Sequence, residues 1–484
     1  MMDNNAAYQA LTSRDVRFDG VFYVGVTSTG IYCRPICPVK APRQENCVFF
    51  DSAEAAEKAS FRPCLRCRPE LAPGNAPVDN AHRIAGLLVQ RIDESEEDGE
   101  SLFNIARQLG ISARQLRRIV QQQLGVSPRE LKRTRRLLLA KQLLTETQLP
   151  VTEIAFASGF TSLRRFNDAF NRQYRMSPSR LRKAATDEHQ HVDAADTSTL
   201  QLSYRPPYDW QAMLAFLRLR AIKDVELITE DSYARTVRLG NCTGWVRVTH
   251  APAKHALMVE FTHSLTPVLP ALLRRLRNLF DLAARPDLIA AHLQQYPLLQ
   301  QSVLSHPGLR VPGAYDGFEM AIRAILGQQI TVKAATTLAC RFADAFGAHI
   351  ATPFTELSRL SPLATRITEA SIDDIASLGI VSARARCILA MAQACASGEL
   401  QLEAGNDPDK AIAQLVTLPG IGQWTANYIA MRALRWPDAF PKEDIAIRNN
   451  LGGVSAKQAE EMSQAWRPWR SYAVMHIWKN MSAK

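Results

Sequence analysis

The chain lacks any run of about 18 uninterrupted apolar residues, which is the length that a membrane-spanning helix needs. Its opening residues, MMDNNAAYQALTSRD, also lack the basic start and the apolar segment of a secretion signal. Five of the nine cysteines stand singly, unlike the dense pattern of disulfide-stapled secreted domains. These absences argue against a membrane or secreted protein, and we expect a protein of the reducing cytoplasm.

Positive charge is in excess. The chain contains 58 Lys and Arg against 47 Asp and Glu, which gives a formal net charge of +11 and a pI near 9.3. The excess is steepest within residues 112–136, where eight Lys and Arg face the single acid Glu130. A basic balance alone is weak evidence, but such clustering indicates nucleic acid as a partner.

Two polar segments are expected to act as linkers. ESEEDGE at 94–100 is short and acidic, and AATDEHQHVDAADTSTL at 184–200 has no apolar period. After the second linker, strand-like runs such as GWVRVTH and HALMVEF give way to a helical pattern that continues almost to the end. The chain is long enough for several domains, and we expect them at 1–75, 80–183, 201–288 and 289–484.

Four cysteines form two close pairs, C-x3-C and C-x2-C, at Cys33, Cys37, Cys64 and Cys67. Thiolates are soft ligands that zinc prefers, and two close pairs joined by a loop can form a closed tetrahedral site. The spacing therefore predicts one zinc ion, and by itself it favours a purely structural role. Cys47 lies between the pairs without a partner and is expected to fill space.

The flanking residues, STGIYCRPIC and FRPCLRC, resemble the N-terminal domain of the Ada family of DNA-repair proteins over roughly the first 75 residues. The resemblance implies that Cys33 accepts a methyl group from a methylphosphotriester in DNA, while the other three cysteines complete the zinc site. A zinc-bound sulfur is deprotonated yet nucleophilic, so it can attack the methyl carbon of a neutral triester. Methylation would make the site less negative and so strengthen DNA binding, which would make the modification a switch.

Two segments repeat the layout of helix, glycine turn and helix: SLFNIARQLGISARQLRRIVQQQLGVSP and VTEIAFASGFTSLRRFNDAFNRQYRMSP. With the connecting segment ELKRTRRLLLAKQLL they resemble the tandem helix-turn-helix domain of the AraC type. Recognition helices enter the major groove of DNA, and a solvated basic face is the alternative. The candidate DNA contacts are Arg114, Gln115 and Arg118 in the first copy, and Ser162, Arg164, Arg165 and Asn167 in the second.

The stretch LVTLPGIGQWTANYIAMRAL at 415–434 contains a glycine hairpin before a helix. The unpaired amides of Gly420 and Gly422 would suit a DNA phosphate, although a plain turn is the alternative. FPKEDIAIR then places Asp444 at the start of a new helix. Together with YRPPYDW, LRVPGAYDGFEMAIRAILGQQI and RPWRSYAVMHIW, these motifs resemble the helix-hairpin-helix DNA glycosylases, and 201–482 resembles the AlkA-type 3-methyladenine glycosylases.

This resemblance implies that Asp444 is the catalytic aspartate. Cleavage of an N-glycosidic bond builds positive charge on the deoxyribose, which a desolvated carboxylate stabilises. The resemblance also assigns Trp424, Tyr428 and Trp478 to a pocket that holds a flipped-out, cationic base between aromatic faces. Core packing is the alternative for each ring taken singly. Lyases of this fold carry a lysine where Trp424 stands, so we expect a monofunctional hydrolase.

Two positions depart from the family pattern. Gln329 stands where an apolar wedge is usual, so we expect it to contact DNA, with insertion into the duplex either weaker or made by another residue. Lys479 follows Trp478 where an aromatic residue is common, which affects the shape of the pocket and its base preference. A complete Ada-type protein would also need a PCHR nucleophile motif, which is missing from the sequence.

We therefore expect a multidomain, mainly α protein with a small α/β zinc domain, a tandem helix-turn-helix domain, an antiparallel β-rich domain and an all-α helix-hairpin-helix glycosylase domain. It should act as a monomer on alkylated double-stranded DNA, bind no membrane, and activate transcription with RNA polymerase when methylated. The alternative is a DNA-binding regulator whose zinc site is purely structural and whose C-terminal half holds DNA without catalysis.

Overall fold

The computed structural model describes residues 4–14, 19, 22–50, 53–67, 69, 84, 88, 106–107, 111–186 and 196–481. The chain forms two compact units, one of Met1–Ile92 with Glu100–Leu131 and one of Asp93–Gly99 with Lys132–Lys484. The expected linker at 94–100 lies outside the described residues. So do residues 187–195 of the second expected linker, whose last residues already belong to a strand that begins at Thr197.

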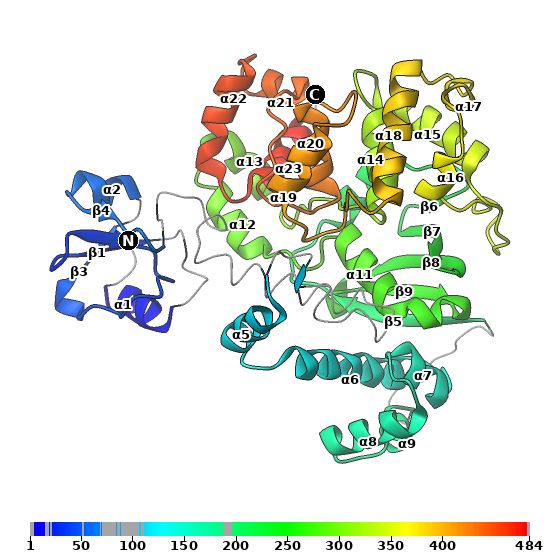
Figure 1. Ribbon diagram of the computed structural model, residues 1–484, viewed down its shortest axis with the longest axis horizontal. Helices are drawn as coiled ribbons and strands as arrows, with labels where there is room; N and C mark the ends of the chain where they lie inside the picture. Colours follow the sequence, from blue (N-terminus) through cyan, green and yellow to red (C-terminus); the bar gives the residue numbers. More distant parts are fainter. Residues whose placement is uncertain are drawn as a thin grey trace. The chain divides into compact units, whose positions relative to one another are not determined.

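The first unit contains a four-stranded sheet in the order β3-β1-β2-β4 (Figure 1). Its elements are α1 (Asn4–Ser13), β1 (Tyr23–Val26), β2 (Ile31–Cys33), β3 (Cys47–Phe50), α2 (Ala53–Lys58) and β4 (Arg62–Pro63). β1 pairs antiparallel with β2 and β3, whereas β2 and β4 run parallel. The parallel pairing matters because β2 ends at Cys33 and Cys64 follows β4 directly. The amide of Cys64 donates to the carbonyl of Tyr32 at 3.0 Å, so both cysteine pairs meet at one end of the sheet.

Five helices follow: α5 (Ala113–Leu124), α6 (Pro128–Glu146), α7 (Val151–Ala157), α8 (Leu163–Tyr174) and α9 (Pro178–Thr186). The two expected recognition helices start in the same way, because the hydroxyl groups of Ser112 and Ser162 accept N-cap hydrogen bonds from the amides of Gln115 and Arg165. Of the helix expected before α5, only residues 106 and 107 are described.

The next region is a five-stranded antiparallel sheet in the order β5-β9-β8-β7-β6. Its elements are β5 (Thr197–Ser203), α10 (Trp210–Arg218), β6 (Glu226–Ile228), β7 (Ser232–Leu239), β8 (Cys242–Ala251), β9 (Ala256–Thr262), the 3-10 helix η4 (His263–Val268) and α11 (Leu269–Leu279). The first strand of the region, β5, pairs with the last, β9, and so lies at an edge of the sheet.

The rest of the chain is helical. Its helices are α12 (Pro286–Leu293), α13 (Pro297–Ser305), α14 (Gly317–Leu326), α15 (Val332–Phe346), α16 (Ala364–Thr368), α17 (Ile372–Ala376), α18 (Ser382–Ala396), α19 (Pro408–Leu415), α20 (Gln423–Arg432), α21 (Ile445–Asn450), α22 (Ala456–Ser463) and α23 (Arg470–Met481). Helix α14 packs against α15, α18 and α20 around a core of buried apolar side chains that includes Ile325, Met391 and Ile429. None of the described helices has the length and apolar character that a membrane crossing would require.

Buried ion pairs join the β-rich region to the helical region. Arg235 of β7 contacts Glu319 of α14 at 2.7 Å, and Arg323 of α14 contacts Glu226 of β6 at 2.6 Å. Arg323 also donates to the backbone carbonyl of Arg220 at 2.5 Å. Because breaking one partner of such a pair leaves an uncompensated buried charge, the network fixes the two regions relative to each other. The expected mainly α, multidomain fold class is confirmed.

Candidate metal centre and active site

The four paired cysteines come together at the end of the small sheet. The sulfur atoms of Cys33, Cys37, Cys64 and Cys67 all lie within 4.8 Å of one another, and all four side chains are buried. Cys37 Sγ is 3.9 Å from Cys64 Sγ. With Zn–S bonds of about 2.3 Å, the sulfurs of a tetrahedral site lie about 3.8 Å apart. The donor set therefore fits zinc in number, kind and spacing.

Hydrogen bonds within this cluster stabilise a thiolate. Those from Cys33 and Cys67 lower the pKa of the Cys37 thiol to about 3, and the hydrogen bond to Cys37 raises the pKa of Cys33. The backbone amide of Arg34 donates to Cys67 Sγ at 3.4 Å. The Arg34 side chain is itself buried, and its Nε donates to Asp19 at 2.7 Å. The cluster thus offers negative charge to a cation in a rigid setting.

In the second unit, Asp444 is the N-cap of α21 and both of its carboxylate oxygens accept hydrogen bonds. Oδ1 accepts from the backbone amide of Ile447 at 2.9 Å, and Oδ2 accepts from the indole Nε1 of Trp424 at 3.0 Å. Trp424 lies on α20, directly after the glycine hairpin. The carboxylate expected to be catalytic is therefore held in one orientation by two elements, and it lines a cavity of about 1290 Å³.

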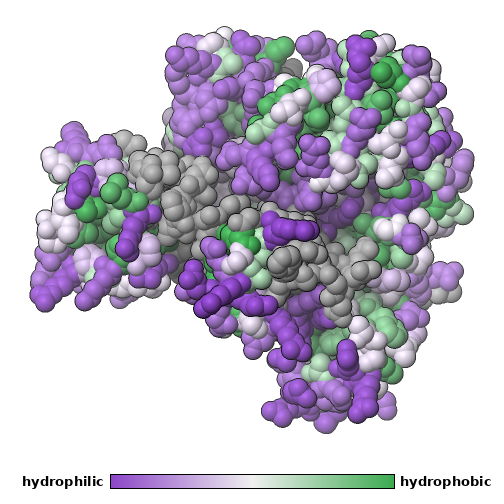
Figure 2. Space-filling view, in the orientation of Figure 1, coloured by the Kyte–Doolittle hydropathy of each residue, from purple (hydrophilic) through white to green (hydrophobic). Residues whose placement is uncertain are grey.

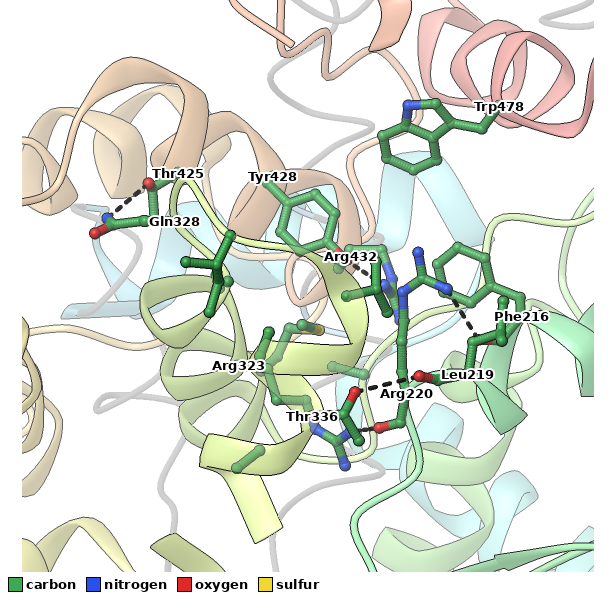
Figure 3. Close-up of a pocket in the computed structure, with 18 of the residues that line it drawn as sticks. Phe216, Leu219, Arg220, Arg323, Gln328, Thr336, Thr425, Tyr428, Arg432 and Trp478 are labelled. Atoms are coloured by element: carbon green, nitrogen blue, oxygen red, sulfur yellow. Dashed lines mark hydrogen bonds between the residues drawn. The ribbon is translucent and has the colours of Figure 1, made fainter. Parts of the chain in front are cut away.

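The three expected pocket aromatics line the same cavity. The rings of Trp424 and Tyr428, one turn apart on α20, are stacked with 5.4 Å between centroids and 5° between planes. Trp478 of α23 is 6.3 Å from Tyr428 and tilted by 52°. Figure 3 shows Trp478 and Tyr428 reaching the cavity from different helices. The arrangement brings flat aromatic faces close to the carboxylate, as recognition of a flipped base requires.

The lining of the cavity includes residues that were not predicted from the sequence. Arg432 Nη1 donates to Tyr428 Oη at 2.8 Å, and the guanidinium of Arg220 lies 3.7 Å from the centre of the Phe216 ring (Figure 3). Burial alone would raise the pKa of Tyr428, but the positive charges of Arg432 and Arg220 lower it. No local motif marks Phe216 and Arg220, because they reach the cavity from the β-rich region. Arg432 lies two turns beyond Trp424 on α20, a spacing that could have indicated it.

The hairpin and the loop after α14 form the exposed rim. Gly420 has a φ of +82°, which favours glycine, and Gly422 is the N-cap of α20 with open space around it. Gln328, also missed from the sequence, donates through Nε2 to the carbonyl of Gly420 at 2.9 Å and to Thr425 Oγ1 at 3.0 Å. Gln329 is exposed, lines the cavity and has a φ of +55°. These contacts fasten the loop to the hairpin.

The candidate DNA contacts lie on the surfaces of α5 and α8. Arg114, Gln115 and Arg118 are exposed on α5, and Arg164 and Arg165 are exposed on α8. Asn167 is half-buried, and the Ser162 hydroxyl is engaged as the N-cap of α8, so helix capping is an alternative role for that serine. The two helices belong to different compact units.

Four protein families match successive parts of the chain. They are described as the metal binding domain of Ada at residues 6–70, a helix-turn-helix domain at 105–184, the AlkA N-terminal domain at 199–316 and the HhH-GPD superfamily of base excision DNA repair proteins at 322–471. The expected combination of domains is confirmed, and the four-cysteine site lies in a zinc-binding domain.

Individual relatives cover different shares of the chain. DNA-3-methyladenine glycosylase 2 of Escherichia coli is 35% identical over 57% of this chain and 95% of its own length. AdaA of Bacillus subtilis, a bifunctional transcriptional activator/DNA repair enzyme, is 28% identical over 39% of this chain and 86% of its own length. The solved 3-methyladenine DNA-glycosylase of Archaeoglobus fulgidus shares the fold, with a TM-score of 0.50 and 19% identity over 57% of this chain and 96% of that one.

A relative in Mycobacterium tuberculosis matches both halves together. The probable bifunctional transcriptional activator/DNA repair enzyme AlkA of Mycobacterium tuberculosis is 37% identical over 99% of this chain and 97% of its own length. The match extends through the zinc, helix-turn-helix, β-rich and helix-hairpin-helix regions in the same order. The chain therefore belongs to the family of bifunctional transcriptional activator/DNA repair enzymes of the AlkA type.

Proposed function

We propose that the C-terminal half is a monofunctional DNA glycosylase that excises 3-methyladenine-type bases from double-stranded DNA. The observation that carries this proposal is the placement of Asp444, whose carboxylate is oriented by the Trp424 indole at the edge of an aromatic-lined cavity. A carboxylate held this way in a largely apolar cavity is suited to stabilise a cationic sugar. The glycosylases among the relatives support the same reaction.

In the proposed reaction the bond between C1′ and the damaged base breaks, and its electron pair leaves with the base. Positive charge then develops on the deoxyribose, where the Asp444 carboxylate stabilises it. Water attacks C1′ and releases a proton to solvent. An alkylated purine is already cationic, so it needs little help from an acid to leave. Trp424 offers no amine for a Schiff base, and strand cleavage is not part of the proposal.

The cavity would hold the base by stacking and charge. The parallel faces of Trp424 and Tyr428 and the ring of Trp478 favour a flat cation, since aromatic faces attract positive charge. Gly420, Gly422 and Gln329 would contact the DNA backbone at the exposed rim, where hairpin amides at the start of α20 can bind a phosphate. Lys479 also lines the cavity, where its positive charge would oppose a cationic base and so would affect base preference.

For the N-terminal half we propose methyl transfer from a DNA methylphosphotriester to Cys33. Bound zinc would supply the positive charge that keeps the cysteine sulfurs deprotonated. The Cys33 sulfur attacks the methyl carbon, the carbon–oxygen bond breaks, and the phosphodiester leaves as an anion. The product thioether is not reversed, so each chain would react once. Cys37, Cys64 and Cys67 would complete the metal site.

Regulation follows from the same proposal. Loss of one thiolate charge would weaken the repulsion between the zinc site and the DNA backbone. The helices α5 and α8 could then hold a promoter next to RNA polymerase. The chain would act as a monomer. The alternative is a regulator with a purely structural zinc site and a DNA-holding C-terminal half that does not catalyse.

A single incubation with DNA that carries methylphosphotriesters and 3-methyladenine tests both activities. Native mass spectrometry should show one zinc and one added methyl group per chain, and chromatography should show released 3-methyladenine. An intact chain with zinc but without methyl or released base would support the alternative. Cys47→Ser is a matched control, since Cys47 lies outside the four-sulfur cluster and should change neither readout.

A further inference from the structure

The boundary between the two compact units does not fall between the helix-turn-helix domain and the glycosylase. It falls at Leu131–Lys132, inside α6, so most of α6 together with α7, α8 and α9 belongs to the same compact unit as the β-rich region. The second helix-turn-helix is therefore part of the glycosylase body in the fold, although the family matches assign it to a different domain.

Polar contacts join α6 to the edge of the sheet. The backbone amide of Gln201 in β5 donates to Glu146 Oε2 at 2.8 Å, and its carbonyl accepts from Gln142 Nε2 at 2.7 Å. Gln142 and Glu146 are one turn apart on α6, and Gln142 Nε2 also donates to Glu146 Oε2 at 3.0 Å. β5 is an edge strand, whose outward amides and carbonyls are open to pairing unless something covers them. The C-terminal end of α6 covers the outward edge of β5 at Gln201.

Apolar contacts continue the same interface. Buried side chains of the connecting helix α6, such as Leu143, and of the second helix-turn-helix, such as Phe166, belong to one continuous hydrophobic core with Leu200 and Leu202 of β5. Helix α7 lies against η4, the segment that follows β9. A core shared in this way is disrupted when either side moves, because apolar surface would return to water. The second helix-turn-helix and α6 thus form a packed interface with the β-rich region and are not joined to it by a flexible linker alone.

This docking leaves the exposed, basic side of α8 open. Phe166 and Phe170 point into the shared core, whereas Arg164 and Arg165 on the opposite side are exposed. Arg172, Arg175 and Arg180 add exposed positive charge at the end of α8 and on α9. Hydrophilic side chains largely cover this end of the unit (Figure 2). A basic, solvent-facing helix suits a nucleic-acid backbone.

We infer that the second helix-turn-helix is a fixed DNA-binding arm of the glycosylase, which grips undamaged duplex through α8 at a constant distance from Asp444. Because the arm is fixed, the contact between α8 and the duplex forms at a high effective concentration once the glycosylase has bound, since no linker has to lose entropy. The partner is the phosphate backbone of the duplex that continues beyond the damaged base. The inference rests on the proposed glycosylase function, because the arm would position DNA for base excision. Its tests measure amide exchange and DNA binding, which do not depend on base excision.

The first test follows the amide of Gln201 by hydrogen exchange in the full chain. In the wild type this amide should be protected, because Glu146 accepts its hydrogen bond. The double variant Gln142→Ala/Glu146→Ala should raise its exchange rate at least about 10-fold. Lys141→Ala/Thr145→Ala, on the same helix but outside the contact, should leave the rate unchanged. Free exchange of the Gln201 amide in the wild type would overturn the docked arrangement.

The second test compares binding to two duplexes that carry an uncleavable abasic-site analogue, one of about 12 bp and one of about 40 bp. Arg164→Ala/Arg165→Ala should weaken binding of the long duplex about 10-fold at low salt and leave binding of the short one unchanged. Wild-type affinity of this variant for the long duplex would show that α8 does not hold the duplex, and would overturn the inference.

Excision on the same two duplexes, with 3-methyladenine in place of the analogue, separates the two proposals. Absence of base release by the wild type would defeat the proposed glycosylase activity, while the exchange and binding results would still decide whether the arm is fixed. Normal base release with length-independent binding would defeat only the arm.

Discussion

The indole Nε1 of Trp424 donates a hydrogen bond to Oδ2 of Asp444 at 3.0 Å, which connects the helix after the hairpin to the N-terminus of α21. The same tryptophan stacks on Tyr428. One side chain therefore orients the carboxylate and forms part of the aromatic wall, and substitution can separate these two roles.

Trp424→Phe keeps an aromatic face but removes the hydrogen-bond donor. One hydrogen bond to a charged group contributes about 1.5–3 kcal/mol, so we expect single-turnover excision of 3-methyladenine to slow about 10- to 100-fold. Binding of duplex with an abasic-site analogue should change little, because the stacking face remains. Asp444→Asn should lose more activity than Trp424→Phe does. Trp469→Phe, outside the cavity lining, is the control, and an unaltered rate in Trp424→Phe would show that the indole does not position the carboxylate.

Chelation of zinc should separate the two halves. The four sulfurs lie in the first compact unit and the cavity in the second. Structural zinc contributes directly to the folding of small domains. We therefore expect a strong chelator to unfold the zinc domain and abolish methyl uptake, while 3-methyladenine release on short duplexes continues at its original rate. Circular dichroism and the excision assay on one sample would check this, and a parallel loss of excision would contradict it.

Cys33→Ser asks whether the first cysteine is the methyl acceptor. All four cysteines are buried to a similar extent, so exposure does not single one out. We expect Cys33→Ser to lose all methyl uptake while excision stays unchanged. Peptide mapping of the methylated wild type should place the methyl group on Cys33. A methyl group found on Cys64 instead would move the acceptor role to that residue, which is also a member of the cluster.

Motif residues were predictable from sequence because their chemistry is local. The cysteine pairs, the hairpin glycines and Asp444 each sit in a short segment whose residue types and spacing suffice to identify them. Phe216 and Arg220 could not be found in that way, since they enter the cavity from a region about two hundred residues earlier in the chain. Their role depends on how the β-rich region packs on α14, a property of tertiary structure that no local pattern records.

The docking of α6 on β5 was equally hidden. The polar composition of 184–200 predicted a separation of the two halves, and composition does carry information about a linker. It carries none about whether the elements on either side pack together. Gln142 and Glu146 look like ordinary surface residues of a helix, and nothing in the sequence indicates that both bond to the edge of the sheet.

Stability should fall on mild acidification because of His476. Its Nδ1 lies 3.0 Å from Ser302 Oγ, and burial, with help from His306, lowers its pKa to about 4. An unfolded histidine titrates near 6.5. Between these two pKa values the unfolded chain binds a proton that the folded chain does not. The stabilisation of the folded state is therefore complete above pH 6.5 and is lost as the pH falls towards 4. We expect a loss of about 2 kcal/mol in unfolding free energy between pH 7 and pH 5.

Urea unfolding at several pH values, followed by tryptophan fluorescence, checks this expectation. His476→Gln should unfold with a shallower dependence on pH than the wild type in that range. His349→Gln changes an exposed histidine and should keep the wild-type slope. Equal slopes in wild type and His476→Gln would show that His476 is not responsible.

Gln329→Leu should introduce an apolar wedge at the rim of the cavity. Gln329 is exposed and has a φ of +55°, a left-handed conformation that costs any residue with a Cβ about 1–2 kcal/mol. Glutamine already bears that cost, so leucine should be accommodated without further strain. An apolar side chain between unstacked bases favours the flipped state, and we expect duplex with an abasic-site analogue to bind about 10-fold more tightly. Gln329→Ala, which shortens the side chain without adding a wedge, should bind no more tightly than the wild type. If Gln329→Leu fails to improve binding, an apolar side chain at this position does not act as a wedge in this protein.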